Sequence, residues 1–306
     1  MNGGVEDLLS VPGAPLLRDP GDERIGGLEE CSRSAIIGIP WDWSVTGRPG
    51  PRLAPQRIRG YLYGLTPYSP VHGSITCRPH DLGDVRVAPG LWSTTRARIA
   101  SVSITLLEEY ERVYLVGGDH SIAGPALEAL AHVEDRVSLV MLDHHYDLRS
   151  TSEGLTSGSW LYEVLTRVPG RIEALIVGVG DYSNPSYLAE RAMRLGVKVI
   201  PRHSLLQGDG LDTVREALDS LEDPVYLSID MDHLDQAYAP GVNSPGVMGM
   251  DPRETLLILE GLAGKRIRMI DLVEVNPLVD VADSTSRLAA KVLAYLFNLL
   301  EAGGGA

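Results

Sequence analysis

The stretch VSLVMLDHHYD, residues 137–147, decides the fold, because an apolar run passes directly into a cluster of acids and histidines. A short run that is apolar at almost every position is typical of a strand buried on both faces of a sheet. Similar runs recur along the chain at wide spacing, namely Ala35–Pro40, Arg112–Val116, Ala174–Val179, Val197–Ile200, Val225–Ile229 and Ile267–Val273. We therefore expect a sheet built from strands with little polar surface.

Segments with helical spacing of apolar residues lie between these runs. They are Arg96–Glu111, Pro125–His132, Ser186–Leu195, Asp212–Leu221, Arg253–Leu262 and Ser284–Leu300, the last with Asp283 or Ser284 as its N-cap. Alternation of strands and helices predicts an α/β fold with a parallel sheet covered by helices on both faces. We expect one domain over residues 31–306, preceded by an extension of residues 1–30 that is loose or used between subunits.

Composition excludes several classes of protein. The 306 residues carry a net charge of −14, which leaves no basic surface for nucleic acid. The first ten residues lack a basic start and an apolar run, and no apolar stretch of roughly 18 residues is present, so neither a signal peptide nor a membrane span is expected. Cys31 and Cys77 form no CxxC pair, which predicts free cysteines and a reducing, cytoplasmic location.

Chemically reactive residues follow four of the predicted strands. The clusters are GGDHS at 117–121, DHHYD at 143–147, DMDHLD at 230–235 and EVNP at 274–277. Ligand sites of parallel sheets lie beyond the carboxyl ends of the strands, so these clusters are expected to converge.

Spacing within the clusters indicates metal ligands. Residues two apart in extended chain point the same way, so Asp143, His145 and Asp147 share one side, as do Asp230 and Asp232. Converging carboxylates would repel one another without cations, and His120 adds a second imidazole. Such a ligand set suits Mn²⁺, with Zn²⁺, Ni²⁺ or Fe²⁺ as alternatives, and two ions with a shared water are a common hydrolytic device.

Each member of these clusters also has a purely structural interpretation. Gly117 and Gly118 fit a simple turn, and Asp119, Asp143 or Asp230 alone could cap a strand or helix. His144 points opposite to its neighbours, and His233 and Asp235 fit supporting roles, so these three are not expected to be ligands. It is the combination of clusters after buried strands that favours a metal site.

The motifs GGDHS, DxHxD, SxDxD, APG and EVNP resemble those of the ureohydrolases, which include arginase, agmatinase and formimidoylglutamase. Residues 37–59, 81–85 and 283–290 also resemble segments of that family. The resemblance implies a three-layer α/β/α sandwich around a mostly parallel sheet of about eight strands, a homo-oligomer (trimer or hexamer) and, usually, two Mn²⁺ ions.

The resemblance also implies roles for individual residues. One metal would be held by His120, Asp143, Asp147 and Asp230, and the other by Asp143, His145, Asp230 and Asp232. Glu274 would bind the amidinium or guanidinium group. Independently of the resemblance, we hypothesise that Asp147, as both ligand and neighbour of the attacking hydroxide, passes a proton to the departing amine and is thus the second catalytic residue.

Details of the loops resemble formimidoylglutamase more than arginase or agmatinase. Ser157 precedes Gly158 where arginases and agmatinases usually have histidine, and Asp147-Leu148-Arg149 and residues 178–196 also resemble this subgroup. The implied substrate is N-formimidoyl-L-glutamate, a small amidine, with Arg149 and Ser157 as substrate-binding residues. Alternatively, Arg149 pairs with an acid such as Glu153.

Other residues and activities remain open at this point. Trp41, Trp43 and Tyr146 are candidates for the substrate mouth, with core or interface packing expected for at least one of the tryptophans. Arg48 and Arg52 either contribute charge or hold their own loop. The alternative activities are hydrolysis of arginine, agmatine or another guanidine with release of urea, deacetylation at a single zinc, and a non-catalytic role.

Overall fold

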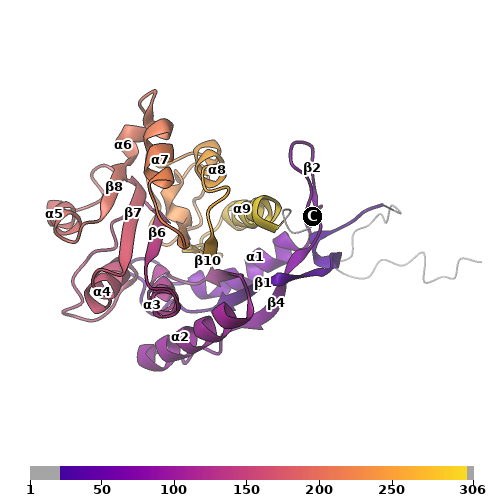
Figure 1. Ribbon diagram of the computed structural model, residues 1–306, viewed down its shortest axis with the longest axis horizontal. Helices are drawn as coiled ribbons and strands as arrows, with labels where there is room; N and C mark the ends of the chain where they lie inside the picture. Colours follow the sequence, from indigo (N-terminus) through magenta and orange to yellow (C-terminus); the bar gives the residue numbers. More distant parts are fainter. Residues whose placement is uncertain (1–20, 302–306) are drawn as a thin grey trace, which may run out of the picture.

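The computed structural model describes residues 21–301, and its centre is a sheet of eight strands (Figure 1). The strands are β1 Glu30–Ile39, β4 Arg78–Asp84, β5 Arg112–Gly117, β6 Val137–Leu142, β7 Ile172–Val179, β8 Lys198–Pro201, β9 Val225–Asp230 and β10 Ile267–Val273. They lie in the order β4-β1-β5-β10-β9-β6-β7-β8, and every neighbouring pair is parallel. A separate hairpin joins β2 Tyr68–Ser69 to β3 Gly73–Ser74.

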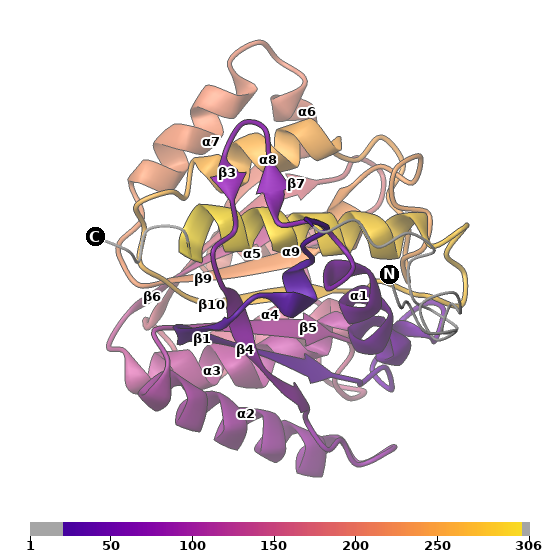
Figure 2. The ribbon, with the colours of Figure 1, turned by 90° about the vertical axis from the view of Figure 1, so that its right-hand side faces the viewer.

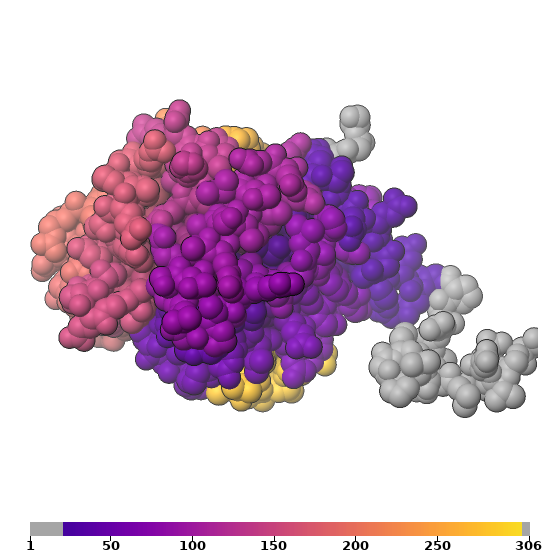
Figure 3. Space-filling model, turned by 90° about the horizontal axis from the view of Figure 1, so that it is seen from below, coloured from indigo at the N-terminus to yellow at the C-terminus, as the bar shows by residue number. Residues whose placement is uncertain are grey.

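Helices cover the sheet on both faces, which confirms the three-layer expectation (Figures 1 and 2). On one face lie α1 Ala54–Leu62, α6 Arg202–Leu205, α7 Gly210–Asp219, α8 Pro252–Glu260 and α9 Ser284–Glu301. On the other face lie α2 Trp92–Glu109, α3 Ala123–Val133, α4 Trp160–Arg167 and α5 Ser186–Arg194. In the space-filling view from below, the side on which α2 lies in Figure 1, purple atoms occupy the middle of the face (Figure 3).

Each central strand contributes side chains to both layers of the core. Along β5, Val113 and Leu115 pack in the α2–α5 layer, whereas Tyr114 and Val116 pack in the opposite layer. All four side chains are fully buried. This double burial explains the continuous apolar pattern of the sequence, and each such aliphatic side chain contributes about 1.5–3 kcal/mol of burial free energy.

The expectation of free cysteines is wrong. Cys31 in β1 and Cys77, one residue before β4, form a disulfide with their Cα atoms 5.2 Å apart. Parallel pairing places Cys31 opposite Pro79, so cysteines 46 residues apart in the sequence become neighbours at the edge of the sheet. The two cysteines therefore do not indicate a reducing compartment.

The expected extension of residues 1–30 lies only partly within the described chain. Residues 1–20 and the C-terminal GGGA fall outside the described residues. In the short 3-10 helix Ile25–Gly27, Ile25 is fully buried in the core, and its N–H donates a hydrogen bond to the carbonyl of Leu65. Within residues 21–301, no helix has the length and apolar character needed to cross a bilayer.

Candidate active site

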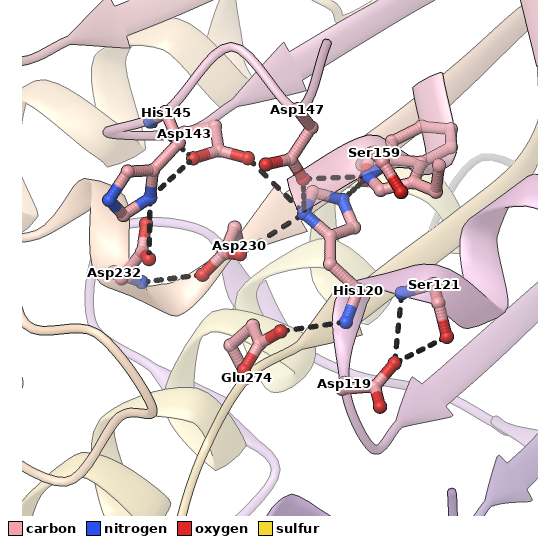
Figure 4. A network of polar contacts seen from close by, with 12 residues as sticks. Asp119, His120, Ser121, Asp143, His145, Asp147, Ser159, Asp230, Asp232 and Glu274 are labelled. Carbon is pink, nitrogen blue, oxygen red and sulfur yellow. Dashed lines mark hydrogen bonds and ion pairs between the residues drawn. The ribbon is translucent and has the colours of Figure 1, made fainter. Parts of the chain in front are cut away.

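The four central strands of the sheet supply the candidate site. β5, β10, β9 and β6 are consecutive neighbours in the sheet, although they are distant from one another in the chain. His120 follows β5, Glu274 follows β10, Asp230 ends β9 with Asp232 just beyond it, and Asp143 follows β6. Because parallel strands present their carboxyl ends at one edge, the four predicted clusters meet there (Figure 4).

A first group of side chains surrounds one nitrogen of His120. Nδ1 of His120 lies 3.2 Å from Oδ2 of Asp143, 3.0 Å from Oδ2 of Asp147 and 3.1 Å from Oδ2 of Asp230. All four side chains are buried, and His120 is fully so. One imidazole nitrogen and three carboxylate oxygens thus point to a common position.

A second group shares Asp143 with the first. Nδ1 of His145 lies 3.0 Å from Oδ2 of Asp232 and 3.5 Å from Oδ1 of Asp143. His145, Asp143 and Asp232 can present ligand atoms to a single ion, as can His120, Asp143 and Asp147. The two oxygens of Asp143 face different groups, which is the arrangement that a bridging carboxylate requires.

The electrostatics of the cluster fit bound cations. Burial raises the pKa of the Asp143 carboxyl to about 6, and the neighbouring Asp147 and Asp232 carboxylates act in the same direction. Burial, with Asp232 and Asp143, raises the pKa of Asp230 well above its usual range. Nδ1 of His120 and Oδ2 of Asp143 approach closely, and neither has a hydrogen-bond partner within residues 21–301. Carboxylate and imidazole donors of this kind suit Mn²⁺ and related divalent ions, so the residues present fit a metal centre.

Glu274 lies beside the cluster, and only one of its two carboxylate oxygens accepts a hydrogen bond from a described residue. Its Oε1 accepts a hydrogen bond from the backbone N–H of His120 at 2.8 Å, whereas its buried Oε2 has no partner among the described residues. Burial and the nearby Asp119 carboxylate raise the pKa of Glu274 well above its usual range. A cationic group that donates to Oε2 would relieve this unfavourable burial.

Two of the acidic residues have left-handed backbone conformations. Asp147 has a φ of 51° and Glu274 a φ of 67°, a region that non-glycine residues seldom adopt. The indole N–H of Trp160 donates to Oδ2 of Asp147 at 2.7 Å, which fixes that carboxylate. Residues kept in such conformations by their surroundings are often found at functional sites.

The GGDHS segment fixes the neighbouring loop as well as His120. The carboxylate of Asp119 accepts hydrogen bonds from the backbone N–H groups of Ser44 and Ser121. A Cβ atom at position 118 would lie 1.7 Å from the carbonyl oxygen of Trp41, so only glycine fits there. Asp119 is therefore a supporting residue, consistent with the structural interpretation considered for it.

A pocket of about 150 Å³ opens onto the cluster. Its lining includes the predicted residues Arg149, Ser157 and Glu274 together with His145, Asp147, Asp230 and Asp232. It also includes residues that the sequence did not single out as site residues, namely Thr46, Gly158, Ser183, Asn184, Leu188, Asn243 and Ser244. Ser183 and Asn184 follow β7, where the strand-end rule points, whereas Asn243 and Ser244 lie in a long loop with no such signal.

Arg149 faces this pocket without a carboxylate partner. No acid of the described chain, Glu153 included, lies within ion-pair distance of its guanidinium group. The backbone on either side is fixed, because the N–H of Arg149 donates to the carbonyl of Gly158 and the side chain of Arg191 donates to the carbonyl of Leu148. The alternative pairing with Glu153 is thus wrong, and a positive charge is available to a ligand.

The other candidates have structural roles. The ring of His144 lies against Gly180, and its Nε2 contacts Ser183 Oγ at 2.8 Å, so it is not in the ligand groups. His233 contacts Thr255, and Asp235 accepts hydrogen bonds from loop N–H groups, as expected. Arg48 donates to the carbonyls of Val242 and Asn243, and Arg52 pairs with Asp42, so both hold loops.

None of the three aromatic candidates for the substrate mouth is among the lining residues of the pocket. Trp41 is buried in the core against Trp43 and Trp92. Trp43 is exposed and is covered in part by Arg52, and Tyr146 packs partly buried against the core.

Comparison with known proteins agrees with this geometry. The arginase family model matches residues 32–298. Formimidoylglutamase of Halobacterium salinarum is 32% identical over 92% of this chain and 95% of its own length. Mitochondrial agmatinase of Gallus gallus is 31% identical over 93% of this chain and 85% of its own length.

Among solved structures, formimidoylglutamase of Bacillus subtilis superimposes with a TM-score of 0.90 at 26% identity, over 98% of both chains. The agreement thus extends over the sheet, the helical layers and the loops that carry the candidate ligands. With a family model and relatives that each span most of its length, this chain belongs to the arginase family.

Proposed function

We propose that this chain is a metal-dependent hydrolase that converts N-formimidoyl-L-glutamate and water into L-glutamate and formamide. The observation that carries the proposal is the pocket itself. Its lining includes Glu274, whose Oε2 has no partner among the described residues, and Arg149, which forms no ion pair with any of them. An amidinium at one end and carboxylates at the other end of a small ligand match this distribution of charge.

His120, Asp143, Asp147 and Asp230 would hold one divalent ion, and Asp143, His145, Asp230 and Asp232 the other. We propose two Mn²⁺ ions per chain, with Ni²⁺, Fe²⁺ or Zn²⁺ as alternatives for the same ligands. When bound, the ions would supply a water of lowered pKa as the nucleophile.

The protein side chains would orient the substrate and move the proton. Oε2 of Glu274 accepts a hydrogen bond from the amidinium, which holds the planar group with its central carbon facing the metal ligands. Trp160 holds Oδ2 of Asp147, whereas Oδ1 lies on the side of Gly158, which also lines the pocket. Oδ1 of Asp147 is therefore the atom proposed to carry the proton to the departing amine of glutamate.

The substrate tail would be bound by Arg149, with Ser157 beside it. The backbone that carries this guanidinium is held at Arg149 by Gly158 and at Leu148 by Arg191, and a planar guanidinium can bind a carboxylate through two hydrogen bonds. Agmatine carries a cationic tail and is a poor match for this wall. Guanidino acids carry a carboxylate and are the stronger alternative, since one relative at 31% identity is the human mitochondrial guanidino acid hydrolase.

A panel of substrates tests the proposal. Metal-free protein is loaded with Mn²⁺ or Ni²⁺ and incubated with formimidoylglutamate, guanidinobutyrate, arginine, agmatine and guanidine, and formamide and urea are measured separately. We expect formamide from formimidoylglutamate and little urea from the others. Urea from a guanidine as the dominant product would reject the substrate assignment in favour of a guanidino-compound hydrolase.

The proposal also includes the oligomeric state of the protein and its location in the cell. The resemblance to this family supports a trimer or hexamer of identical chains, and light scattering of the purified protein tests it. A cytoplasmic location remains a prediction, to be tested by cell fractionation, with the Cys31–Cys77 disulfide as an observation against it.

A further inference from the structure

A chain of hydrogen bonds lies behind His120, on the side away from the candidate metal ligands. Nε2 of His120 is 2.8 Å from Oγ of Ser228, and that hydroxyl donates to Oδ1 of Asp271 at 2.8 Å. All three residues are fully buried. Ser228 in β9 and Asp271 in β10 are directly paired across the sheet, so the two elements fix this contact by their register.

The single proton of the Ser228 hydroxyl determines how His120 is protonated. Because Ser228 donates this proton to the Asp271 carboxylate, it can only accept at its contact with Nε2 of His120. Nε2 must therefore carry a hydrogen. The other nitrogen, Nδ1, faces the carboxylates of Asp143, Asp147 and Asp230 in Figure 4, and it is the nitrogen whose lone pair is needed to hold an ion.

We propose that Asp271 is a positioning residue for the metal centre, acting through Ser228 to hold His120 with Nε2 protonated and Nδ1 free for an ion. Asp271 is not among the candidate metal ligands or the residues that line the pocket. This inference rests on one part of the proposed function, namely that His120 binds a metal ion. Partners that donate to or accept from the outer nitrogen of a ligating histidine commonly fix its ring and strengthen its binding.

A merely structural role does not explain why the carboxylate of Asp271 is buried. Carboxylates inside a hydrophobic core are costly, and Met269 and Val273, which share a face of β10 with Asp271, are fully buried apolar side chains. An aliphatic residue at position 271 would satisfy packing alone. The Asp271 carboxylate interacts with the Tyr226 hydroxyl and the Ile229 backbone as well as with Ser228, and the contact with Ser228 is the one that leads on to His120.

The test uses Asp271→Asn and Ser228→Ala, with Thr255→Val as a matched control. Thr255 contacts Nε2 of His233 at 2.9 Å, so its variant removes the same kind of buried hydroxyl–imidazole contact at a histidine outside the ligand groups. Metal-free proteins are titrated with Mn²⁺ against a competing chelator. We expect wild type and Thr255→Val to bind two Mn²⁺ ions. Asp271→Asn and Ser228→Ala, which we call the relay variants, should each lose about 10- to 100-fold in Mn²⁺ affinity at one of the two metal positions.

Two further measurements make the result independent of activity. Thermal unfolding of the metal-free variants verifies that each one folds, and if Asp271→Asn does not fold, the decision rests on Ser228→Ala. In zinc-loaded protein labelled with ¹⁵N-histidine, the wild-type signal of His120 should show Nε2 protonated, and the relay variants should alter it. Folded relay variants that bind two Mn²⁺ ions with wild-type affinity would overturn the inference. A wild type that binds fewer than two ions contradicts the proposed function instead.

Discussion

Removal of the Cys31–Cys77 disulfide should lower the stability of the fold without changing its chemistry. The perturbation is the double variant Cys31→Ser/Cys77→Ser, compared with wild type in the presence and absence of reductant. The cross-link joins residues 46 apart in the sequence and so restricts a long loop of the unfolded chain. Loop-closure entropy for that length corresponds to about 4 kcal/mol at 25 °C, which is an upper value because strain and residual structure reduce it.

The assay is thermal unfolding followed by circular dichroism. For a domain of this size, a loss of about 4 kcal/mol corresponds to a fall in Tm of roughly 6 °C. The double variant should be insensitive to reductant, and denatured wild type should show no free thiol until it is reduced. Activity at 25 °C should be unchanged, because Cys31 lies near the start of β1 whereas the site lies at the carboxyl ends of the strands.

Two results would refute this reasoning. Free thiols in denatured wild type that has never met a reductant would show that the bond is absent in solution. A wild type that keeps its Tm on full reduction, and unfolds together with the double variant, would show that the β1–β4 edge gains no stability from the bond.

Three other predictions concern the site. Arg149→Met should raise KM for formimidoylglutamate about 10- to 100-fold and leave kcat nearly unchanged, as steady-state kinetics would show, because it removes a charged contact to the tail alone. Asp147→Asn should lower kcat by about 10²-fold or more, and full turnover with two bound metals, counted by elemental analysis, would exclude it as the proton carrier. The metal-free protein should lose Tm as pH rises from about 4 to about 7, as scanning fluorimetry would show. Burial raises the pKa of Asp143 to about 6 and that of Asp119 to about 7 in the folded protein, so the stabilising protons are lost over this range, and added Mn²⁺ should restore Tm.

Buried elements could be predicted from the sequence because burial dictates their composition. The run Val137–Leu142 corresponds residue for residue to β6, and Ile267–Val273 to β10. β4 was missed because it lies at the edge of the sheet, and its residues RPHDLGD are mostly polar and contain no apolar run. α1 and α4 were missed as well, being short helices of nine and eight residues close to prolines or glycines.

The ligand clusters were found because local spacing controls which way neighbouring side chains point. Their mutual placement depends on strand order, which no local pattern encodes, and the same holds for the Cys31–Cys77 pair. Asn243 and Ser244 reach the pocket through a loop whose path depends on contacts with Arg48 and Glu274. Loop contacts of this kind depend on the whole fold.

The place of β10 in the sheet has a consequence for biosynthesis. This strand is the last to be synthesised, yet it lies between β5 and β9, in the middle of the sheet. A nascent chain that ends before residue 267 therefore has two half-sheets with an open seam, and it lacks both Glu274 and the carboxylate behind His120. Insertion of β10 closes this seam, so we expect a ribosome-bound fragment to acquire ions only after its final strand has emerged.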